Sequence, residues 1–313
     1  MNELNRREFL LTAATAALAG ERAFATSGAA NAYAGKLCFF SKHLPQLDWR
    51  QLGQTVKQLG FDGVDLTVRP GGHVKPESAA ADLPKALDAI RAAGLAVPMI
   101  TTGLLTAEEP TAQPILATAG KLGIPYFKAG YHKYQFKDTR AELQQAGQAF
   151  QSLAGLSQKH NIQAGFHNHS GYVGGGIWDF IPLMEKLDAR WAGWYYDPHH
   201  AVAEGGAGAW KAALQWIAPR IKMVAVKDFT WEKTAKGWAT QDCPLGAGMV
   251  DWKHFFATLA RGGFSGPISL HIEYDIAGKT ASEQEANMLA AAARDLAFLK
   301  TRIAEAYGTA TTQ

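Results

Sequence analysis

The chain has 313 residues, of which 47% are hydrophobic, 19% charged and 11% aromatic, and its formal net charge is +3. This composition is typical of a globular protein and excludes a disordered or collagen-like chain. The charge is too small and too dispersed to indicate a nucleic-acid partner. No apolar run in the sequence reaches the ~18 residues that span a bilayer, which excludes a polytopic membrane protein.

The first 25 residues predict an export signal. Arg6 and Arg7 are followed by an apolar stretch that runs to about Gly20 and by an Ala-Phe-Ala sequence that ends at Ala25. This pattern is typical of a secretory signal, and the paired arginines are typical of the twin-arginine type. About 12 apolar residues are too few for a stable membrane anchor. We therefore expect residues 1–25 to engage the twin-arginine export machinery and the mature protein to be periplasmic or otherwise extracytoplasmic.

From Lys36 onward, short β-rich runs alternate with helical patterns. The predicted strands are 37–40, 63–68, 96–101, 125–129, 162–169, 192–197, 223–229 and 267–274. The predicted helices are 48–60, 82–94, 111–122, 140–160, 178–188, 209–217, 252–261 and 281–306. Such alternation indicates βαβ units arranged around a parallel sheet.

Eight such units in about 270 residues predict an α/β protein of the (β/α)8 TIM barrel class. The barrel is expected to be a single domain over residues 36–306, followed by a C-terminal tail at 307–313. A doubly wound open sheet is the alternative, and it normally has a glycine-rich turn after its first strand. Here the first strand continues into Ser-Lys-His-Leu-Pro, residues 41–45, which contains no glycine. The barrel is therefore the predicted architecture.

Ionisable side chains gather at the ends of the last four predicted strands, where a parallel barrel places its functional groups. These residues are His167, His169, Asp197, His199, His200, Lys227, Asp228, His271 and Glu273. Side chains two residues apart on a strand share a face, so His167 and His169 point the same way, and His271 and Glu273 form a second such pair. Converging imidazoles and carboxylates are ligands for Mn, Fe, Co, Ni or Zn. The sequence thus predicts a divalent metal site, in which His199 or His200 joins Asp197.

The order of these motifs resembles the xylose-isomerase-like TIM barrel superfamily, the sugar phosphate isomerase/epimerase group. The run Gly-Phe-Asp-Gly-Val-Asp-Leu that includes Asp65 is similar to its second-strand signature. Asp197-x-x-His200 is similar to the sixth-strand metal aspartate and its companion histidine, and Lys227-Asp228 is similar to the seventh-strand pair. The resemblance covers nearly all of the mature chain and implies a barrel, a sugar substrate, a divalent metal and a homo-oligomer.

Three positions depart from the metal set of Glu, Asp, His and Glu that many members carry on strands five to eight. His167 and His271 stand at the two glutamate positions, and Ala225 stands at the histidine position. The pair of glutamates that moves a proton between two carbons is therefore missing, which argues against simple ketose epimerisation. His167, His271 and Asp197 still offer a two-His, one-carboxylate set, with His200 as a further ligand.

The residues and the resemblance together favour an exported sugar isomerase or epimerase. Such an enzyme would remove a proton next to the carbonyl of a sugar or oxidised sugar with the help of a divalent metal. Glu273 or His169 would act as the base, and Lys227 would stabilise the developing oxyanion. We expect substrate contacts from Asp65, Lys128, His199 and Trp231.

Two alternative functions stay open. A lyase or hydrolase that acts on 3-oxo-glycosides would use the same barrel and suits an extracytoplasmic location. A non-catalytic sugar-binding barrel that has lost its metal site is favoured by Ala225 and by the missing glutamates. A disulfide between Cys38 and Cys243 is also open in an oxidising compartment.

Overall fold

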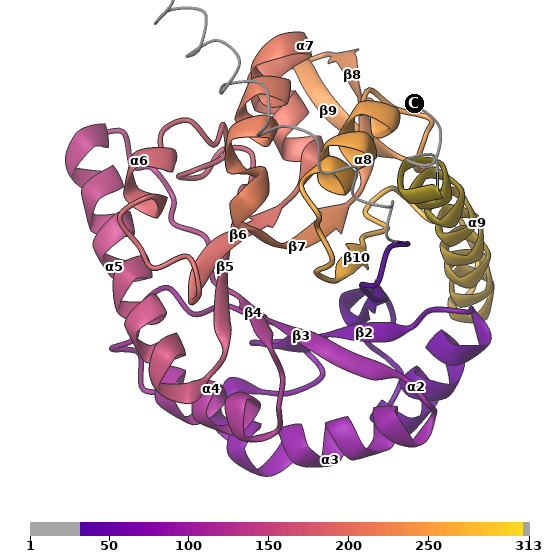
Figure 1. Cartoon of the computed structure of the whole chain (residues 1–313). Coiled ribbons are helices and arrows are strands. Elements are labelled where there is room, and N and C mark those ends of the chain that lie inside the picture. Colours follow the sequence, from indigo (N-terminus) through magenta and orange to yellow (C-terminus); the bar gives the residue numbers. More distant parts are fainter. Residues whose placement is uncertain (1–31, 309–313) are drawn as a thin grey trace, which may run out of the picture.

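The computed structural model describes residues 32–308, which form a closed barrel of eight parallel strands (Figure 1). Its strand order is β1-β10-β7-β6-β5-β4-β3-β2. The barrel strands are β1 (Leu37–Phe40), β2 (Gly63–Val68), β3 (Ala96–Thr102), β4 (Tyr126–Lys128), β5 (Gln163–His167), β6 (Ala192–Tyr196), β7 (Ile221–Val226) and β10 (Ile268–Leu270). The predicted TIM barrel is confirmed. The predicted signal, residues 1–25, lies outside the described residues.

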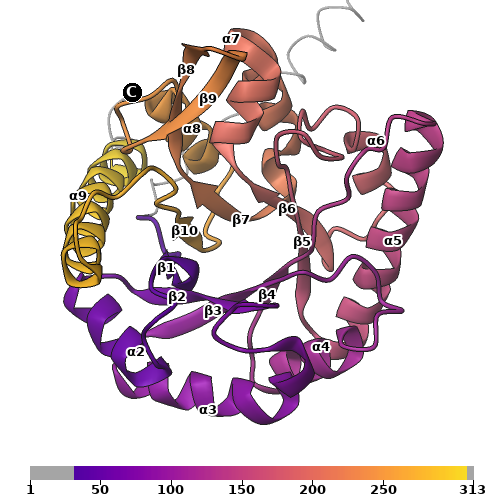
Figure 2. The ribbon, with the colours of Figure 1, turned by 180° about the vertical axis from the view of Figure 1, so that it is seen from behind.

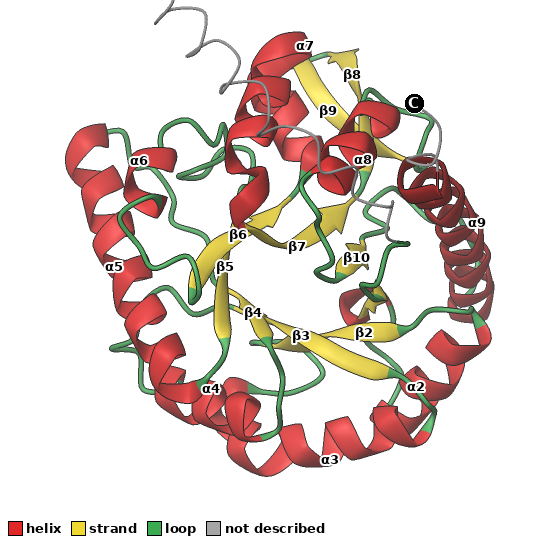
Figure 3. Ribbon diagram, viewed as in Figure 1, coloured by secondary structure: helices red, strands yellow, loops and turns green. Residues whose placement is uncertain are grey.

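A ring of helices surrounds the barrel (Figure 3). The α-helices are α2 (Trp49–Gln58), α3 (Ala79–Ala92), α4 (Ala112–Lys121), α5 (Thr139–His160), α6 (Ile181–Met184), α7 (Pro198–Ile217), α8 (Trp252–Arg261) and α9 (Ala281–Gly308), and the 3-10 helices are η1 (Ser41–His43), η2 (Pro76–Ser78) and η3 (Ala218–Arg220). Helix α9 lies between α8 and α2 and closes the ring (Figure 2). Within the described part of the chain, no helix is long and apolar enough to cross a membrane.

Aspartates begin several of these helices. Asp48, Asp138 and Asp251 each accept a hydrogen bond from the backbone N–H three residues further on. Such a cap satisfies one of the N–H groups that the first turn leaves without a helical partner, and it contributes about 1 kcal/mol. The capping residues therefore set where α2, α5 and α8 start.

Apolar side chains fill two separate layers. The larger cluster lies between the strands and the helices and includes Phe39, Phe127 and Phe255. A smaller cluster of Met99, Tyr195, Met223 and Ala225 fills the barrel interior. Ala225 stands where many relatives are expected to carry a histidine, and here it packs in this apolar interior.

The segment after β7 differs from the predicted strand at 223–229. Strand β7 ends at Val226, and β8 (Asp228–Thr234) then pairs antiparallel with β9 (Gly237–Cys243) to form a hairpin outside the barrel. The hairpin stands between α7 and α9 in both views (Figures 1 and 2). The prediction was wrong because the β-rich composition continues through the end of β7 into the hairpin without a break.

Asp228 connects this hairpin to the loop that follows it. Its buried carboxylate accepts hydrogen bonds from the backbone N–H groups of Gly246, Gly248 and Val250 and from the indole N–H of Trp252, at 2.8–3.3 Å. A buried carboxylate needs such donors to offset its desolvation. Of the Lys227-Asp228 pair, the aspartate therefore has a structural role.

Two helices also differ from their predicted extents. Helix α7 begins at Pro198 rather than at 209, because the side chain of Asp197 caps it by accepting from the backbone N–H of His200. Gly206 lies inside this helix with φ 56°, a left-handed conformation that suits glycine and produces a kink. Helix α6 is a single turn, Ile181–Met184, rather than the predicted 178–188.

The two cysteines are free thiols. Cys38 is buried in β1, and Cys243 is half-buried at the end of β9. Burial raises the pKa of Cys38 well above its usual value and raises the pKa of Cys243 to about 11. Because the thiolate is the reactive form, neither side chain is an activated nucleophile.

Candidate active site

A cavity of about 120 Å³ lies at the carboxyl ends of the barrel strands. All eight strands contribute residues that lie near their ends or just after them, as this fold requires of a functional site. The lining residues are Phe40, Lys42, Arg69, Thr101, Lys128, Tyr131, His167, His169, Tyr195, Lys227, His271 and Glu273. The strand ends thus enclose one small polar cavity.

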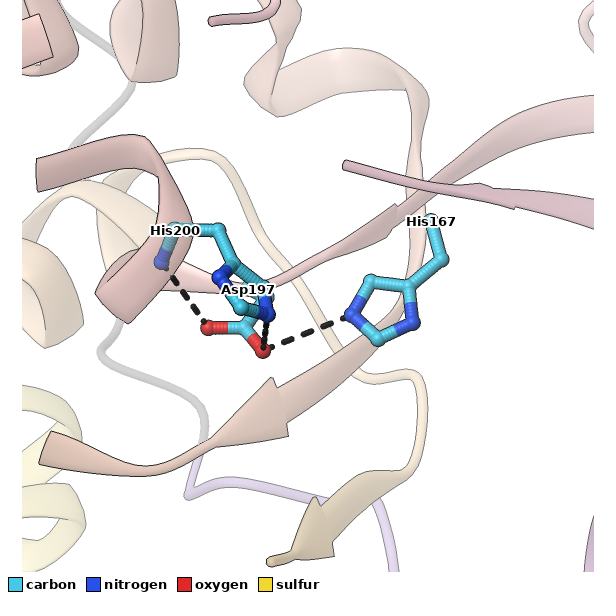
Figure 4. Close-up of side chains that lie close together, drawn as sticks. All are labelled: His167, Asp197 and His200. Carbon is cyan, nitrogen blue, oxygen red and sulfur yellow. Dashed lines mark hydrogen bonds and ion pairs between the residues drawn. The ribbon is translucent and has the colours of Figure 1, made fainter. Parts of the chain in front are cut away.

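Three of the predicted metal ligands converge beside this cavity (Figure 4). His167, Asp197 and His200 each offer one ligand atom, and these atoms lie within 4.8 Å of one another. The Oδ2 atom of Asp197 is 3.4 Å from Nε2 of His167 and 3.6 Å from Nε2 of His200. All three side chains are buried.

The donor set fits a divalent transition metal. Neither ring nitrogen of His200 has a hydrogen-bond partner among the described residues, although both nitrogens are buried. In His167 the Nδ1 atom lies 2.8 Å from the hydroxyl of Tyr131, which orients the ring and leaves Nε2 facing Asp197. Such an outer hydrogen bond is typical of metal-binding histidines. Two imidazoles and one carboxylate suit Mn, Fe, Co, Ni or Zn.

The end of β6 positions Asp197. Asn168 donates its side-chain N–H to the backbone oxygen of Asp197 at 2.9 Å and accepts the backbone N–H of Asp197 at 2.8 Å. Burial opposes the negative charge, but His200 and Lys227 outweigh it and hold the pKa of Asp197 well below its usual value. Asp197 is therefore an anion, the form in which a carboxylate binds a metal.

His271, the fourth predicted ligand, lies outside this group of three. Its Nε2 atom is 3.1 Å from the hydroxyl of Tyr195, and its ring stacks on Phe40 with centroids 4.2 Å apart. Its Nδ1 atom is 4.0 Å from Oε1 of Glu273. The structure thus places His271 in the cavity wall, next to the predicted base.

Lys227 and Glu273 form the charged centre of the cavity. Lys227 Nζ is 3.5 Å from Oδ2 of Asp197 and 3.2 Å from Oε2 of Glu273, and Lys42 Nζ is 2.9 Å from Oε1 of Glu273. Burial lowers the pKa of Lys227, but Asp197 and Glu273 outweigh burial and raise it above its usual value. Burial also acts to raise the pKa of Glu273. The charge of Lys227 outweighs burial and holds that pKa well below its usual range.

His169, the other predicted base, lines the cavity beside the metal ligands. Its ring lies 3.9 Å from that of His200, and its Nδ1 atom is 3.0 Å from the backbone oxygen of Ser170. A carbonyl acceptor fixes the proton on Nδ1 and leaves Nε2 as the basic nitrogen. Burial and the charge of Lys227 lower the pKa of His169, so the ring is neutral at pH 7.

The four predicted substrate contacts are placed differently from one another. Lys128 lines the cavity, whereas Asp65 is buried and accepts hydrogen bonds from Thr101, Ser269 and Tyr195. His199 stacks on Phe229 of the hairpin, and its Nδ1 atom is 3.2 Å from Oδ1 of Asp242. Trp231 is 40% exposed on the hairpin and is not among the cavity-lining residues.

Sequence reasoning missed Lys42, Arg69 and Tyr131 as lining residues. They follow β1, β2 and β4, whose ends do not carry the dense histidine and carboxylate motifs of the later strands. Their position just after a predicted strand is the signal that marks them, because every strand end of a parallel barrel faces the same chamber.

The fold and the site together define a barrel enzyme scaffold with a candidate metal centre. The chain belongs to the xylose isomerase-like TIM barrel family, whose sequence profile matches residues 54–301. No curated protein that was compared matches the chain.

Several solved structures share the fold. They include an L-ribulose 3-epimerase, with 16% identity, a TM-score of 0.66 and coverage of 88% of this chain and 97% of that chain. A second is the apo form of 3-keto-D-glucoside 4-epimerase from E. coli, with 13% identity, a TM-score of 0.62 and coverage of 85% and 99%. A third is a xylose isomerase-like TIM barrel protein from Mycobacterium smegmatis in complex with magnesium, with 15% identity, a TM-score of 0.59 and coverage of 84% and 98%.

Proposed function

We propose that the protein is an enzyme that moves a proton next to the carbonyl group of a sugar or an oxidised sugar, with a divalent metal as its cofactor. One observation carries the proposal: His167, Asp197 and His200 bring three ligand atoms within 4.8 Å beside a cavity that Lys227, Glu273 and His169 also line. The sugar epimerases among the solved structures of the same fold support the substrate class.

The residues divide the chemistry between them. A metal held by His167, Asp197 and His200 would supply Lewis-acid stabilisation to a carbonyl oxygen. Lys227 carries a positive charge in a buried position, where it stabilises oxyanion charge more strongly than in water. His169 is the better base, because its neutral ring has a free lone pair, whereas Lys42 and Lys227 hold Glu273 as a weakly basic carboxylate.

A lyase that acts on 3-oxo-glycosides is the second candidate. The same proton removal expels a leaving group when the neighbouring carbon carries one. A groove of about 570 Å³, lined by residues that include Asp242, Tyr274 and Arg294, offers room for that group. Tyr274 in this groove is the sequence neighbour of Glu273, which lines the cavity. The similarity in fold to a 3-keto-D-glucoside 4-epimerase also supports this reading.

Metal analysis of five proteins tests the proposed site. We expect near-stoichiometric metal in the purified protein and its loss in His167→Ala and His200→Ala. His271→Ala should retain the metal, because His271 lies outside the group of three. His254→Ala, a substitution on α8, is the matched control.

The reaction is tested by incubating the metal-loaded protein with keto-sugars in deuterium oxide. Uptake of deuterium next to the carbonyl, lost in His169→Gln, is the expected result. Release of a free sugar from a 3-oxo-glycoside would favour the lyase. Absence of both metal and exchange would contradict the proposal and favour a sugar-binding barrel without catalytic activity.

We also propose export by the twin-arginine pathway, on the basis of Arg6, Arg7 and the apolar stretch that follows them. N-terminal sequencing of the protein from the periplasmic fraction should begin at Thr26. Replacement of both arginines by lysine should leave an uncleaved precursor inside the cell. Equal export of that variant would contradict the proposal.

A further inference from the structure

The cavity has more positive charge than its own carboxylate neutralises. Four cationic side chains line it, those of Lys42, Arg69, Lys128 and Lys227. The single lining carboxylate, Glu273, forms ion pairs with both Lys42 and Lys227. Arg69 and Lys128 form no ion pair with Glu273.

Arg69 and Lys128 have no ion pair or side-chain hydrogen bond within residues 32–308. The Nζ atom of Lys128 lies 3.4 Å above the ring centre of Tyr131, and the guanidinium of Arg69 lies 5.6 Å from that of Phe40. Both rings belong to the cavity wall. Aromatic faces stabilise a cation by about 1–2 kcal/mol, which is much less than the cost of burying the charge.

The carboxylate of Asp65 forms no ion pair with either of these two cations. Asp65 acts on Lys128 electrostatically, but its carboxylate accepts hydrogen bonds from Thr101, Ser269 and Tyr195 and forms no ion pair with Lys128. Burial lowers the pKa of Lys128 well below its usual value, and the repulsion of Arg69 lowers it further. An anion placed between the two cations would relieve both effects.

We infer that Arg69 and Lys128 form a binding subsite for an anionic oxygen group, so that the substrate of the proposed reaction is a sugar that carries a carboxylate or a phosphate. The subsite lies at the ends of β2 and β4, and the candidate metal ligands lie at the ends of β5 and β6. A substrate that spans the cavity is then held by its charge at one side and presents its carbonyl at the other. This inference rests on the proposed function for the identity of the reacting sugar, but not for the binding of the anion.

Three ketoses that differ at one carbon test the subsite by binding alone. D-fructose, D-fructuronate and D-fructose 6-phosphate carry a hydroxyl, a carboxylate and a phosphate, respectively, at the same end of the sugar. We expect one of the two anions to bind at least about 10-fold more tightly than D-fructose in calorimetric titrations, because a buried charge-assisted contact is strong. The anion that gains affinity identifies carboxylate or phosphate as the recognised group.

The variants assign that gain to the two side chains. Arg69→Gln and Lys128→Met should each remove most of the preference for the anion, and Arg69→Lys should retain part of it. Arg69 is only partly buried, so its variants stay informative if Lys128→Met fails to fold. The exposed cations Arg50 and Lys121 provide the matched controls Arg50→Gln and Lys121→Met, which should keep the preference.

Two results would overturn the inference. One is equal affinity for all three ketoses; the other is an anion preference that survives in both Arg69→Gln and Lys128→Met. Lower turnover in these variants with no loss of anion binding would instead assign the two cations to oxyanion stabilisation. Anion binding without any deuterium exchange would leave the subsite standing and contradict the proposed reaction, so the two failures are distinguishable.

Discussion

The two sides of the barrel mouth differ in how their charges are paired. At the ends of β5 to β7, Asp197 lies within 3.6 Å of His167, His200 and Lys227, so every charge there faces an opposite charge or a neutral ring. At the ends of β2 and β4, Arg69 and Lys128 lie over aromatic rings and form no ion pair among the described residues. The paired cluster has the ligand atoms of the proposed metal site, whereas the two unpaired cations form the proposed anion subsite.

Removal of Asp197 should have the largest effect, because its carboxylate contacts His167, His200 and Lys227. Asp197→Ala is expected to abolish metal binding and activity and to destabilise the fold by about 3–5 kcal/mol, since Lys227 is left as a buried charge with one partner fewer. Metal analysis and urea unfolding measure the two effects. Asp88→Ala, on the exposed surface of α3, is the control. Retention of metal would show that Asp197 is not a ligand.

The substitution Lys227→Met should have the second-largest effect. We expect the turnover number to fall about 100-fold while the metal is retained, because the variant loses oxyanion stabilisation but no metal ligand. Single-turnover deuterium exchange measures it. Lys42→Met tests whether the effect is specific, since Lys42 bonds the same Glu273 from a more exposed position. Equal losses in the two variants would mean that Lys227 acts only through Glu273.

Asp65, which is buried in β2, gives a pH-dependent prediction. Burial raises its pKa from 3.8 to about 6, so the folded state binds more protons than the unfolded state between these values. The free energy of unfolding should therefore fall as pH rises from 4 to 6, by about 2–3 kcal/mol from this group. Asp65→Asn should flatten that part of the profile. An unchanged slope in denaturant titrations would contradict the raised pKa.

Tyr131→Phe should have the smallest effect, and it affects both sides at once. Its hydroxyl orients His167, so metal affinity is expected to fall about 10-fold. Its ring contacts Lys128 and is retained in phenylalanine, so anion affinity should be unchanged. A metal-competition assay measures the metal affinity, and calorimetric titration measures the anion affinity. Loss of anion binding together with metal binding would show that the two sides are not independent.

Local sequence patterns predicted the barrel well and its surroundings less well. Alternating β-rich and helical runs identified all eight barrel strands, because each strand is short, buried and flanked by capping and turn residues. The β8–β9 hairpin was missed, because a strand that leaves the sheet has the same composition as one that stays. The first part of α7, from Pro198, was also missed, and the predicted helix at 209–217 covers only the part after the kink at Gly206.

The sequence by itself determined the fold class, the family and the late-strand residues of the candidate metal site. Strand period and motif order carry that information locally. Only the tertiary structure decided that His200 joins His167 and Asp197 while His271 turns to Tyr195, because barrel closure sets the distances between side chains on different strands. It also decided that Arg69 and Lys128 are left unpaired. Charge neutralisation depends on where the partners lie in space, and no local pattern along the chain records it.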